Sequence, residues 1–234
     1  MTPVGLICAL PAEAKAFAGR PISAGSIARI DPFMIAVTGM GADRAHAGAD
    51  RLLATGARTL VSWGTAGALV PGMRAGDLLL PTSVQYKAQS FDVDPLLRQR
   101  VLERLPSTMH AAQGTLAQAA QVLRSRDDKL RLQAQTDAVA VDMESATVGM
   151  AAQAAGVPFL AVRAIVDAYD VSLPACVIDA TDEFGHTQLV TLVLGLLKQP
   201  RALVDLLRLG AAFRAALVTL RAATPALKAS LGAA

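Results

Sequence analysis

Short apolar runs without polar alternation recur along the first two thirds of the chain, and stretches with helical spacing separate them. Runs that are apolar on both faces are typical of strands buried in a mostly parallel sheet. We therefore expect an α/β domain with helices on both faces of its sheet. The expected strands are Val4–Leu10, Phe33–Thr38, Thr59–Trp63, Asp77–Pro81 and Pro158–Ile165.

Helices are expected between these strands. One begins near Asp43 and repeats its alanines and leucines at helical spacing until Gly56. Another covers Ala146–Ala155 and ends at a glycine that precedes the next strand. The stretch Pro95–Leu132 has a helical composition, but its part Ala111–Leu123 can also contain a strand, and periodicity does not separate the two.

The C-terminal part has a different pattern. Residues Ser172–Gly185 predict a loop, and apolar stretches with helical spacing follow at Thr187–Lys198, Arg201–Leu209 and Ala211–Ala223. Because Gly210 interrupts the apolar stripe, we expect the last two to be separate helices. Their arginines make one face basic, so these helices either cover the sheet or an oligomer contact, or they touch anionic lipid.

The composition fits one domain. With 234 residues and 53% hydrophobic residues, the chain can bury one substantial core. We expect residues 1–185 to form this core and residues 186–234 to form amphipathic helices that pack on it or extend it. Aromatic residues make up only 4% and the net charge is only +3, so nucleic acid is not an expected partner.

The cysteines and the apolar runs indicate the compartment. Cys8 and Cys176 lie far apart and form no CxxC pair, so neither a disulfide framework nor a zinc site is expected. The first apolar run ends at Pro11 without the features of a signal peptide, and the apolar run near the C-terminus is too short to span a bilayer. We expect a cytoplasmic protein. The three histidines lack metal-ligand spacing, so no metal is expected.

Acidic residues interrupt apolar runs at two junctions. Asp142 and Glu144 stand where a strand should give way to a helix. They can be surface or capping residues, or they can accept hydrogen bonds from sugar hydroxyls, because an ionised carboxylate is only an acceptor. Asp167 follows the strand Pro158–Ile165, at the end where open α/β sheets bind ligands. It can cap a turn or, as a protonated acid, act in general acid catalysis.

Glycine-rich segments follow two of the expected strands. Small residues in Gly39-Met40-Gly41 and Gly64-Thr65-Ala66-Gly67 can let backbone amides approach a ligand, and Thr65 adds a hydroxyl. Arg44 stands where a dinucleotide fingerprint needs its third glycine, and the chain has no P-loop or nucleophile-elbow motif. These absences argue against nicotinamide, P-loop nucleotide and serine-hydrolase chemistry.

In this order, the blocks resemble those of the nucleoside phosphorylase and nucleosidase superfamily. The resemblance implies a single α/β domain whose mixed, mostly parallel sheet is partly closed into a barrel and flanked by helices, without a cofactor, and assembled as a homo-oligomer. The segments that carry it are Gly5-Leu6-Ile7-Cys8-Ala9-Leu10-Pro11-Ala12-Glu13, Thr38-Gly39-Met40-Gly41, Gly64-Thr65-Ala66-Gly67, Gly76-Asp77-Leu78, Val141-Asp142-Met143-Glu144-Ser145 and Arg163-Ala164-Ile165-Val166-Asp167.

The resemblance also implies roles for single residues. Asp167 would protonate or hydrogen-bond N7 of a departing purine, while Glu144 would hold the ribose hydroxyls with Met143 against the sugar. Thr65 and Gly67 would line the base or nucleophile side. Further expected substrate-binding residues are Gly41, Asp142 and Val122, the last by packing on the purine.

The identity of the nucleophile stays open. Glu13 aligns with the carboxylate by which nucleosidases activate water, although an acid after Pro11 can also simply favour a helix start. Phosphorylases instead have a Gly-Asp-Pro motif with an arginine in the first loop and a further arginine before the Gly-Ser/Thr loop. Here Ala9–Glu13 and Ser62 occupy these places, so phosphate as a co-substrate would lack its usual donors. The Ser-Gly-Asp segment of nucleosidases is also replaced, by Gly114–Leu123.

The segment after Asp170 resembles one subgroup, the hopanoid-biosynthesis-associated phosphorylases, through Glu183-Phe184-Gly185-His186 and Gln199-Pro200-Arg201. Members are linked to the removal of adenine from adenosylhopane. This implies a purine nucleoside whose 5′ carbon carries a lipid, and peripheral membrane contact through the C-terminal helices. Two alternatives remain: a methylthioadenosine or adenosylhomocysteine nucleosidase, and an inactive nucleoside-binding or scaffold protein of a lipid pathway.

Overall fold

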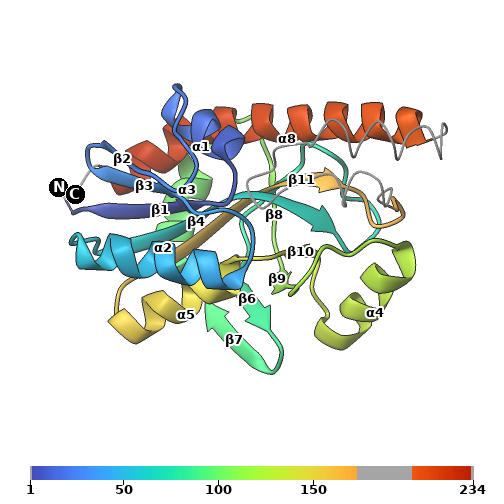
Figure 1. The fold of residues 1–234 in the computed structure, drawn as a ribbon, viewed down its shortest axis with the longest axis horizontal. Coiled ribbons are helices and arrows are strands. Elements are labelled where there is room, and N and C mark those ends of the chain that lie inside the picture. Colours follow the sequence, from blue (N-terminus) through green and yellow to red (C-terminus); the bar gives the residue numbers. More distant parts are fainter. Residues whose placement is uncertain (1, 173–201, 233–234) are drawn as a thin grey trace.

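The computed structural model describes residues 2–172 and 202–232 (Figure 1). In these ranges, eleven strands form one mixed sheet with helices on both sides. This confirms the predicted α/β domain. The expected helix Thr187–Lys198 and all but the first residue of the expected loop Ser172–Gly185 lie outside the described residues, as do Cys176 and His186.

The centre of the sheet consists of buried parallel strands, as the apolar runs predicted. Strand β1 (Val4–Cys8) lies between β3 (Phe33–Val37) and β4 (Thr59–Ala68) and is parallel to both. On its other side β4 pairs in parallel with β11 (Phe159–Asp167). The far end of β4 pairs antiparallel with the short strand β10 (Ala140–Asp142).

The remaining strands extend this centre. The order along the sheet is β2-β3-β1-β4-β10-β9-β6-β7, and β11, β5 and β8 branch off at β4. The expected partial closure into a barrel stays a prediction. The strands not yet given are β2 (Ile27–Ile30), β5 (Leu78–Leu79), β6 (Ser83–Tyr86), β7 (Gln89–Asp92), β8 (Ala111–Ala112) and β9 (Thr115–Gln118).

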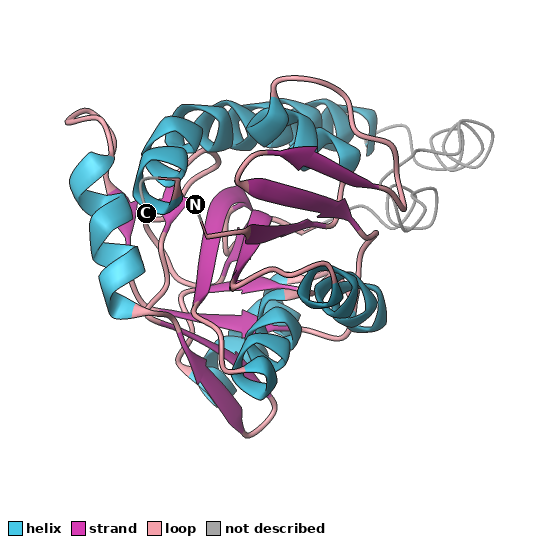
Figure 2. Ribbon diagram, turned by 90° about the vertical axis from the view of Figure 1, so that its left-hand side faces the viewer, coloured by secondary structure: helices cyan, strands magenta, loops and turns pink. Residues whose placement is uncertain are grey.

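Helices cover both faces of the sheet. Figure 1 shows α2 (Ala42–Ala54) and α5 (Ser145–Ala155) on one side, close to their predicted bounds. On the other side lie α1 (Pro11–Ala18) and α8 (Ala202–Leu231), which pack against each other. The side view of Figure 2 shows the strands between these helices. The ambiguous stretch from residue 95 to residue 132 contains helix α3 (Pro95–Arg104), strands β8 and β9, and the first part of α4, which spans residues 126–136.

The predicted break at Gly210 is wrong. Residues 202–231 form one continuous helix, α8, which passes through Gly210 and Pro225. A glycine inside a helix costs only about 1 kcal/mol relative to alanine, and tertiary packing outweighs that cost. The packing comes from a stripe of buried side chains in the second half of α8, which contacts α1, α3 and β11. The stripe consists of Ala216, Leu220, Ala223 and Leu227.

The strand expected at Thr59–Trp63 is longer than predicted, because β4 continues through the glycine-rich segment to Ala68. Strand β11 pairs with β4 along this extension, and β10 pairs with its last two residues. Glycines usually weaken a strand, but they are also found where another group must approach the backbone closely. The candidate site shows what approaches here.

Candidate active site

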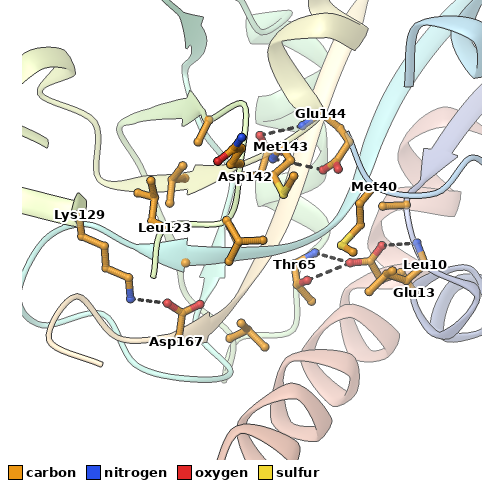
Figure 3. A pocket seen from close by; sticks show the side chains of 18 residues that line it. Leu10, Glu13, Met40, Thr65, Leu123, Lys129, Asp142, Met143, Glu144 and Asp167 are labelled. Carbon is orange, nitrogen blue, oxygen red and sulfur yellow. Dashed lines mark hydrogen bonds and ion pairs between the residues drawn. The ribbon is translucent and has the colours of Figure 1, made fainter. Parts of the chain in front are cut away.

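A cavity of about 200 Å³ lies where several strands end (Figure 3). Its walls come from the second half of β4, from the ends of β10 and β11, from the segments that follow β1, β3, β9 and β10, and from α4. This is the end of the sheet at which α/β proteins bind ligands. All but one of the predicted site residues line it: Glu13, Thr65, Gly67, Val122, Asp142, Met143, Glu144 and Asp167.

Glu13 is held rigidly at one end of the cavity. It is buried in the first turn of α1, and its Oε1 accepts hydrogen bonds from the amide and the hydroxyl of Thr65, both at 2.9 Å. Its Oε2 accepts one from the amide of Leu10 at 3.0 Å. Burial raises the pKa of Glu13, and the positive charge of Arg163 partly opposes this shift. The carboxyl group is thus fixed in place but favours its proton more than an exposed glutamate does.

A change of strand partner along β4 explains why the amide of Thr65 is free for Glu13. On this edge, β1 pairs with residues 59–62 of β4 and β10 pairs with residues 67–68. The intervening stretch of this edge has no strand partner among the described residues. A buried backbone amide must find an acceptor, and here the Glu13 carboxylate supplies it.

The glycines of β4 make room for the two predicted catalytic acids. A Cβ at Gly64 would lie only 2.8 Å from Oε1 of Glu13, and one at Gly67 only 3.0 Å from both carboxylate oxygens of Asp167. The sequence analysis expected these glycines to admit a ligand to the backbone. In the structure they admit the protein's own carboxylates.

Glu144 closes the sugar side of the expected site. It precedes the first residue of α5, and its Oε1 accepts a hydrogen bond of 2.7 Å from the amide of Gly41 at the start of α2. Gly41 does not line the cavity, and its φ of +101° is a conformation that favours glycine. Burial, followed by the charge of Asp142, raises the pKa of Glu144 to about 8, while Arg163 opposes the shift.

Asp142 borders the cavity, but both of its oxygens are engaged within the protein. It accepts hydrogen bonds from the amides of Glu144 and Ser145, which is the capping role left open by the sequence analysis. It also pairs with the buried guanidinium of Arg163, whose Nη2 lies 2.7 Å from Oδ2. The Nη2 of Arg163 donates further to the hydroxyl groups of Ser62 and Ser145. A role for Asp142 in binding substrate stays a prediction.

Arg163 is the counter-charge of Asp142, Glu144 and Glu13. Burial alone would lower its pKa, but Asp142, Glu144 and Glu13 together raise it above its ordinary value. The cluster thus sets three buried carboxyl groups against one guanidinium. Such an arrangement favours the entry of a positive charge into the cavity over the entry of a further negative charge.

Asp167 lies apart from Glu13 in the same cavity (Figure 3). The pairing of β11 with β4 shifts register between Ile165 and Asp167, so that Asp167 stands opposite Gly67. Bulges of this kind re-aim a side chain at the edge of a site. The carboxylate of Asp167 pairs with the ammonium group of Lys129, which comes from α4.

A sequence model described as the phosphorylase superfamily matches residues 3–188 of the chain. The chain belongs to the phosphorylase superfamily. This family assignment confirms the resemblance found in the sequence, and it makes the chain an enzyme that acts on N-glycosyl bonds. Among the described residues, no group of three or more His, Cys, Asp or Glu side chains is arranged to hold a metal ion.

Several solved structures have the same fold, and their similarity extends over nearly the whole of this chain. A methylthioadenosine nucleosidase from Helicobacter pylori is 17% identical with a TM-score of 0.71, and the match covers 100% of each chain. A methylthioadenosine/adenosylhomocysteine nucleosidase from Neisseria meningitidis is 16% identical, with a TM-score of 0.72 and coverage of 99% of this chain and 100% of that one. Futalosine hydrolase from H. pylori is 17% identical, with a TM-score of 0.67 and coverage of 96% and 97%.

The sequence analysis of this phosphorylase-superfamily chain gave no role to Arg163 or Lys129. Arg163 carried a usable signal, because a charge in an otherwise apolar strand needs a buried partner. Lys129 carried none, because it is one polar residue in a polar helix. Only the fold brings it to Asp167.

Proposed function

We propose that the protein releases adenine from a purine nucleoside by hydrolysis, with water rather than phosphate as the nucleophile. One observation carries this proposal: the Glu13 carboxylate accepts three hydrogen bonds from Thr65 and Leu10. Backbone amides and a hydroxyl of this kind are the donors with which a loop holds phosphate. Here an internal carboxylate engages them, so a phosphate beside it would meet negative charge while the donors of Thr65 and Leu10 are already in use.

The charges of the site support the same choice. As an N-glycosidic bond breaks, the ribose gains positive charge, and Glu13 and Glu144 both line the cavity in which it would lie. In their ionised form these carboxyl groups stabilise such a cation more than they stabilise the neutral ground state, which is the difference that accelerates a reaction. Because the pKa of Glu144 is raised to about 8, its share of this effect should grow as pH rises towards 8. A phosphate dianion would add to the negative charge that Arg163 must already balance.

The proposed steps use the predicted residues. Asp167 hands a proton to N7 of the base, and the bond between C1′ and N9 breaks with its electron pair going to the base. Water adds to C1′ and gives its proton to Glu13, whose raised pKa makes it a stronger base than an exposed glutamate. Glu144 accepts hydrogen bonds from the ribose hydroxyls, and Met143 and Val122 pack on the sugar and the base.

For the 5′ substituent we propose a lipid, as in adenosylhopane. An exposed stripe on α8 supports this choice, because apolar and basic side chains alternate along it at helical spacing. It contains Leu207, Arg214, Val218 and Arg221, of which Leu207 is 66% and Val218 61% exposed. Such a surface suits contact with anionic lipid. No helix among the described residues has the length and apolar character needed to cross a bilayer.

A nucleosidase for methylthioadenosine or adenosylhomocysteine is the second candidate. It is favoured by the likeness of the whole chain to two nucleosidases that carry these substrates in their names.

A binding experiment with vesicles of phosphatidylglycerol and phosphatidylcholine distinguishes the two candidates. The lipid assignment predicts cosedimentation that is lost in the double variant Leu207→Glu/Val218→Glu, together with adenine release from vesicles that contain adenosylhopane. Release from 5′-methylthioadenosine alone, without vesicle binding, would favour the second candidate.

Product analysis tests the chemistry itself. Purified protein is incubated with 5′-methylthioadenosine or adenosylhopane, with and without phosphate, and the products are identified by mass spectrometry. We expect adenine and the free ribosyl product in both conditions. A strict phosphate requirement with a ribosyl 1-phosphate product would overturn the role of Glu13. If neither substrate yields adenine, the proposed activity is wrong and the alternative of an inactive binding protein is favoured. The implied homo-oligomer is checked by light scattering of the same preparation.

A further inference from the structure

Lys129 is a buried cation at the edge of the cavity. Its side chain is 1% exposed, and its ammonium group donates to the carboxylate of Asp167 and to the carbonyl oxygens of Ala168, at 2.6 Å, and Val171, at 3.1 Å. An ammonium group has three N–H donors, so these contacts use all of them. Lys129 therefore acts on a substrate only through Asp167.

The helix that carries Lys129 makes this burial unusual. Helix α4 (Arg126–Thr136) is polar, and the structure describes all of it. Lys129 is its one buried side chain. A helix usually docks through apolar residues, and the burial of a charge costs several kcal/mol before its partners offset the cost. The position of α4 thus places an ammonium group against the proposed acid.

The chemistry of Asp167 needs such a neighbour. A carboxylate paired with an ammonium group is ionised, and in that form it has no proton to give to a departing base. The pair as a whole does hold a transferable proton, on Lys129. Both partners lie in the protein interior, where separated charges are costly and a proton shared across the contact reduces that cost.

We propose that Lys129 is the source of the proton that Asp167 passes to the base; this rests on the acid role proposed for Asp167. The Lys129 ammonium gives a proton to the Asp167 carboxylate, and as the bond between C1′ and N9 breaks, the carboxyl group so formed passes a proton to N7. The pair ends as a neutral amine beside a carboxylate, and one proton has moved from the nitrogen of Lys129 to N7 of the base. Solvent restores the ammonium after the base leaves.

A different role would be purely mechanical, because Lys129 also ties the segment after β11 to α4 through Ala168 and Val171. The two roles differ in what a replacement must supply. A mechanical or electrostatic role needs a positive hydrogen-bond donor, whereas a relay needs a donor that can lose its proton. Guanidinium meets the first requirement and not the second.

The experiment compares Lys129→Met, Lys129→Arg and Asp167→Asn on two probes, 5′-methylthioadenosine and 4-nitrophenyl β-D-ribofuranoside. The base of the first must be protonated to leave, whereas nitrophenolate leaves as a stable anion. The relay predicts that all three variants lose about a hundredfold in kcat for adenine release, the usual scale for general acid catalysis. All three should keep most of their nitrophenolate release, which shows that the rest of the site is intact.

Chemical rescue covers the case in which arginine does not fit. Lys129→Ala leaves a gap at the edge of the cavity, and ethylamine added to this variant should restore adenine release while guanidine should not. The relay is overturned if Lys129→Arg works at the wild-type rate, if guanidine rescues as well as ethylamine, or if every Lys129 variant loses both activities without rescue. The proposed function fails separately, and the relay with it, if the wild type releases no adenine or Asp167→Asn releases it at the wild-type rate.

Discussion

Substitution of Gly64 by alanine probes the position of Glu13 without replacing Glu13 itself. A Cβ at this position would lie 2.8 Å from Oε1 of Glu13 and 2.9 Å from its Cδ and Oε2, where ordinary contact begins at 3.4 Å. The carboxylate must therefore retreat by about 0.6 Å. That movement stretches the hydrogen bonds of 2.9 Å from Thr65 to the limit of a useful interaction.

The expected cost follows from these contacts. A hydrogen bond to a charged group contributes about 1.5–3 kcal/mol, so a displaced carboxylate should lose about 3 kcal/mol of transition-state stabilisation. This corresponds to a roughly hundredfold fall in kcat/KM for adenine release. Overpacking should also lower the free energy of unfolding by about 1–3 kcal/mol.

The assay is steady-state adenine release from 5′-methylthioadenosine, together with urea unfolding of the same samples. Gly210→Ala is the matched control, because a Cβ there meets nothing within 4 Å on α8. It should leave kcat/KM unchanged and raise the free energy of unfolding by about 1 kcal/mol. If Gly64→Ala and Gly210→Ala have the same kcat/KM, the position of Glu13 does not govern the reaction and the reasoning fails.

Three further predictions follow from the buried charges. Glu13→Gln should lower adenine release about a hundredfold and the free energy of unfolding by about 1–3 kcal/mol, because the amide oxygen can accept from Thr65 while the amide nitrogen, a donor, then faces the N–H of Leu10; wild-type activity would remove its role as a base. The pKa of Glu144 is raised from 4.5 to about 8, so the folded state binds this proton more tightly and the residue's contribution to stability should fall as pH rises from 4.5 to 8. The melting temperature of Glu144→Gln should lack this fall, and an equal dependence of melting temperature on pH in both proteins would contradict the prediction. Arg163→Met should lower the free energy of unfolding by about 3–5 kcal/mol because it leaves Asp142 unpaired, and adding Asp142→Asn should restore part of the loss in urea unfolding.

Much of the sheet was predictable because buried parallel strands have a simple signature. The runs that became β1, β3, β4 and β11 are apolar on both faces, and burial alone places them in the centre. The strands β6 and β7 were missed because they are half-exposed and carry mixed polar residues, so their pairing decides their structure. The break expected at Gly210 failed for a related reason, since a local propensity of about 1 kcal/mol competed with distant packing.

The site was predictable to the extent that its acids stand at strand ends. Asp167 stands at the carboxyl end of the parallel strand β11, where α/β sheets bind ligands. Asp142 and Glu144 also interrupt an apolar run, but they reach the cavity because the antiparallel strand β10 ends beside β4. What the sequence left open were the partners that set their chemistry. Lys129 approaches from a polar helix, and the contact between Glu13 and Thr65 depends on a gap between two strands. Neither contact produces a pattern of apolar and polar residues from which it could be predicted.

The change of partners along β4 has a consequence for how the enzyme could be tuned. One strand carries the anchor of the proposed base at Thr65 and the neighbour of the proposed acid at Gly67, two residues further on. Two residues of extended strand span about 7 Å, so a continuous strand and not a hinge sets the spacing of these two backbone positions. A substrate of different size would have to be accommodated by the surrounding loops, while the interval itself stays constant.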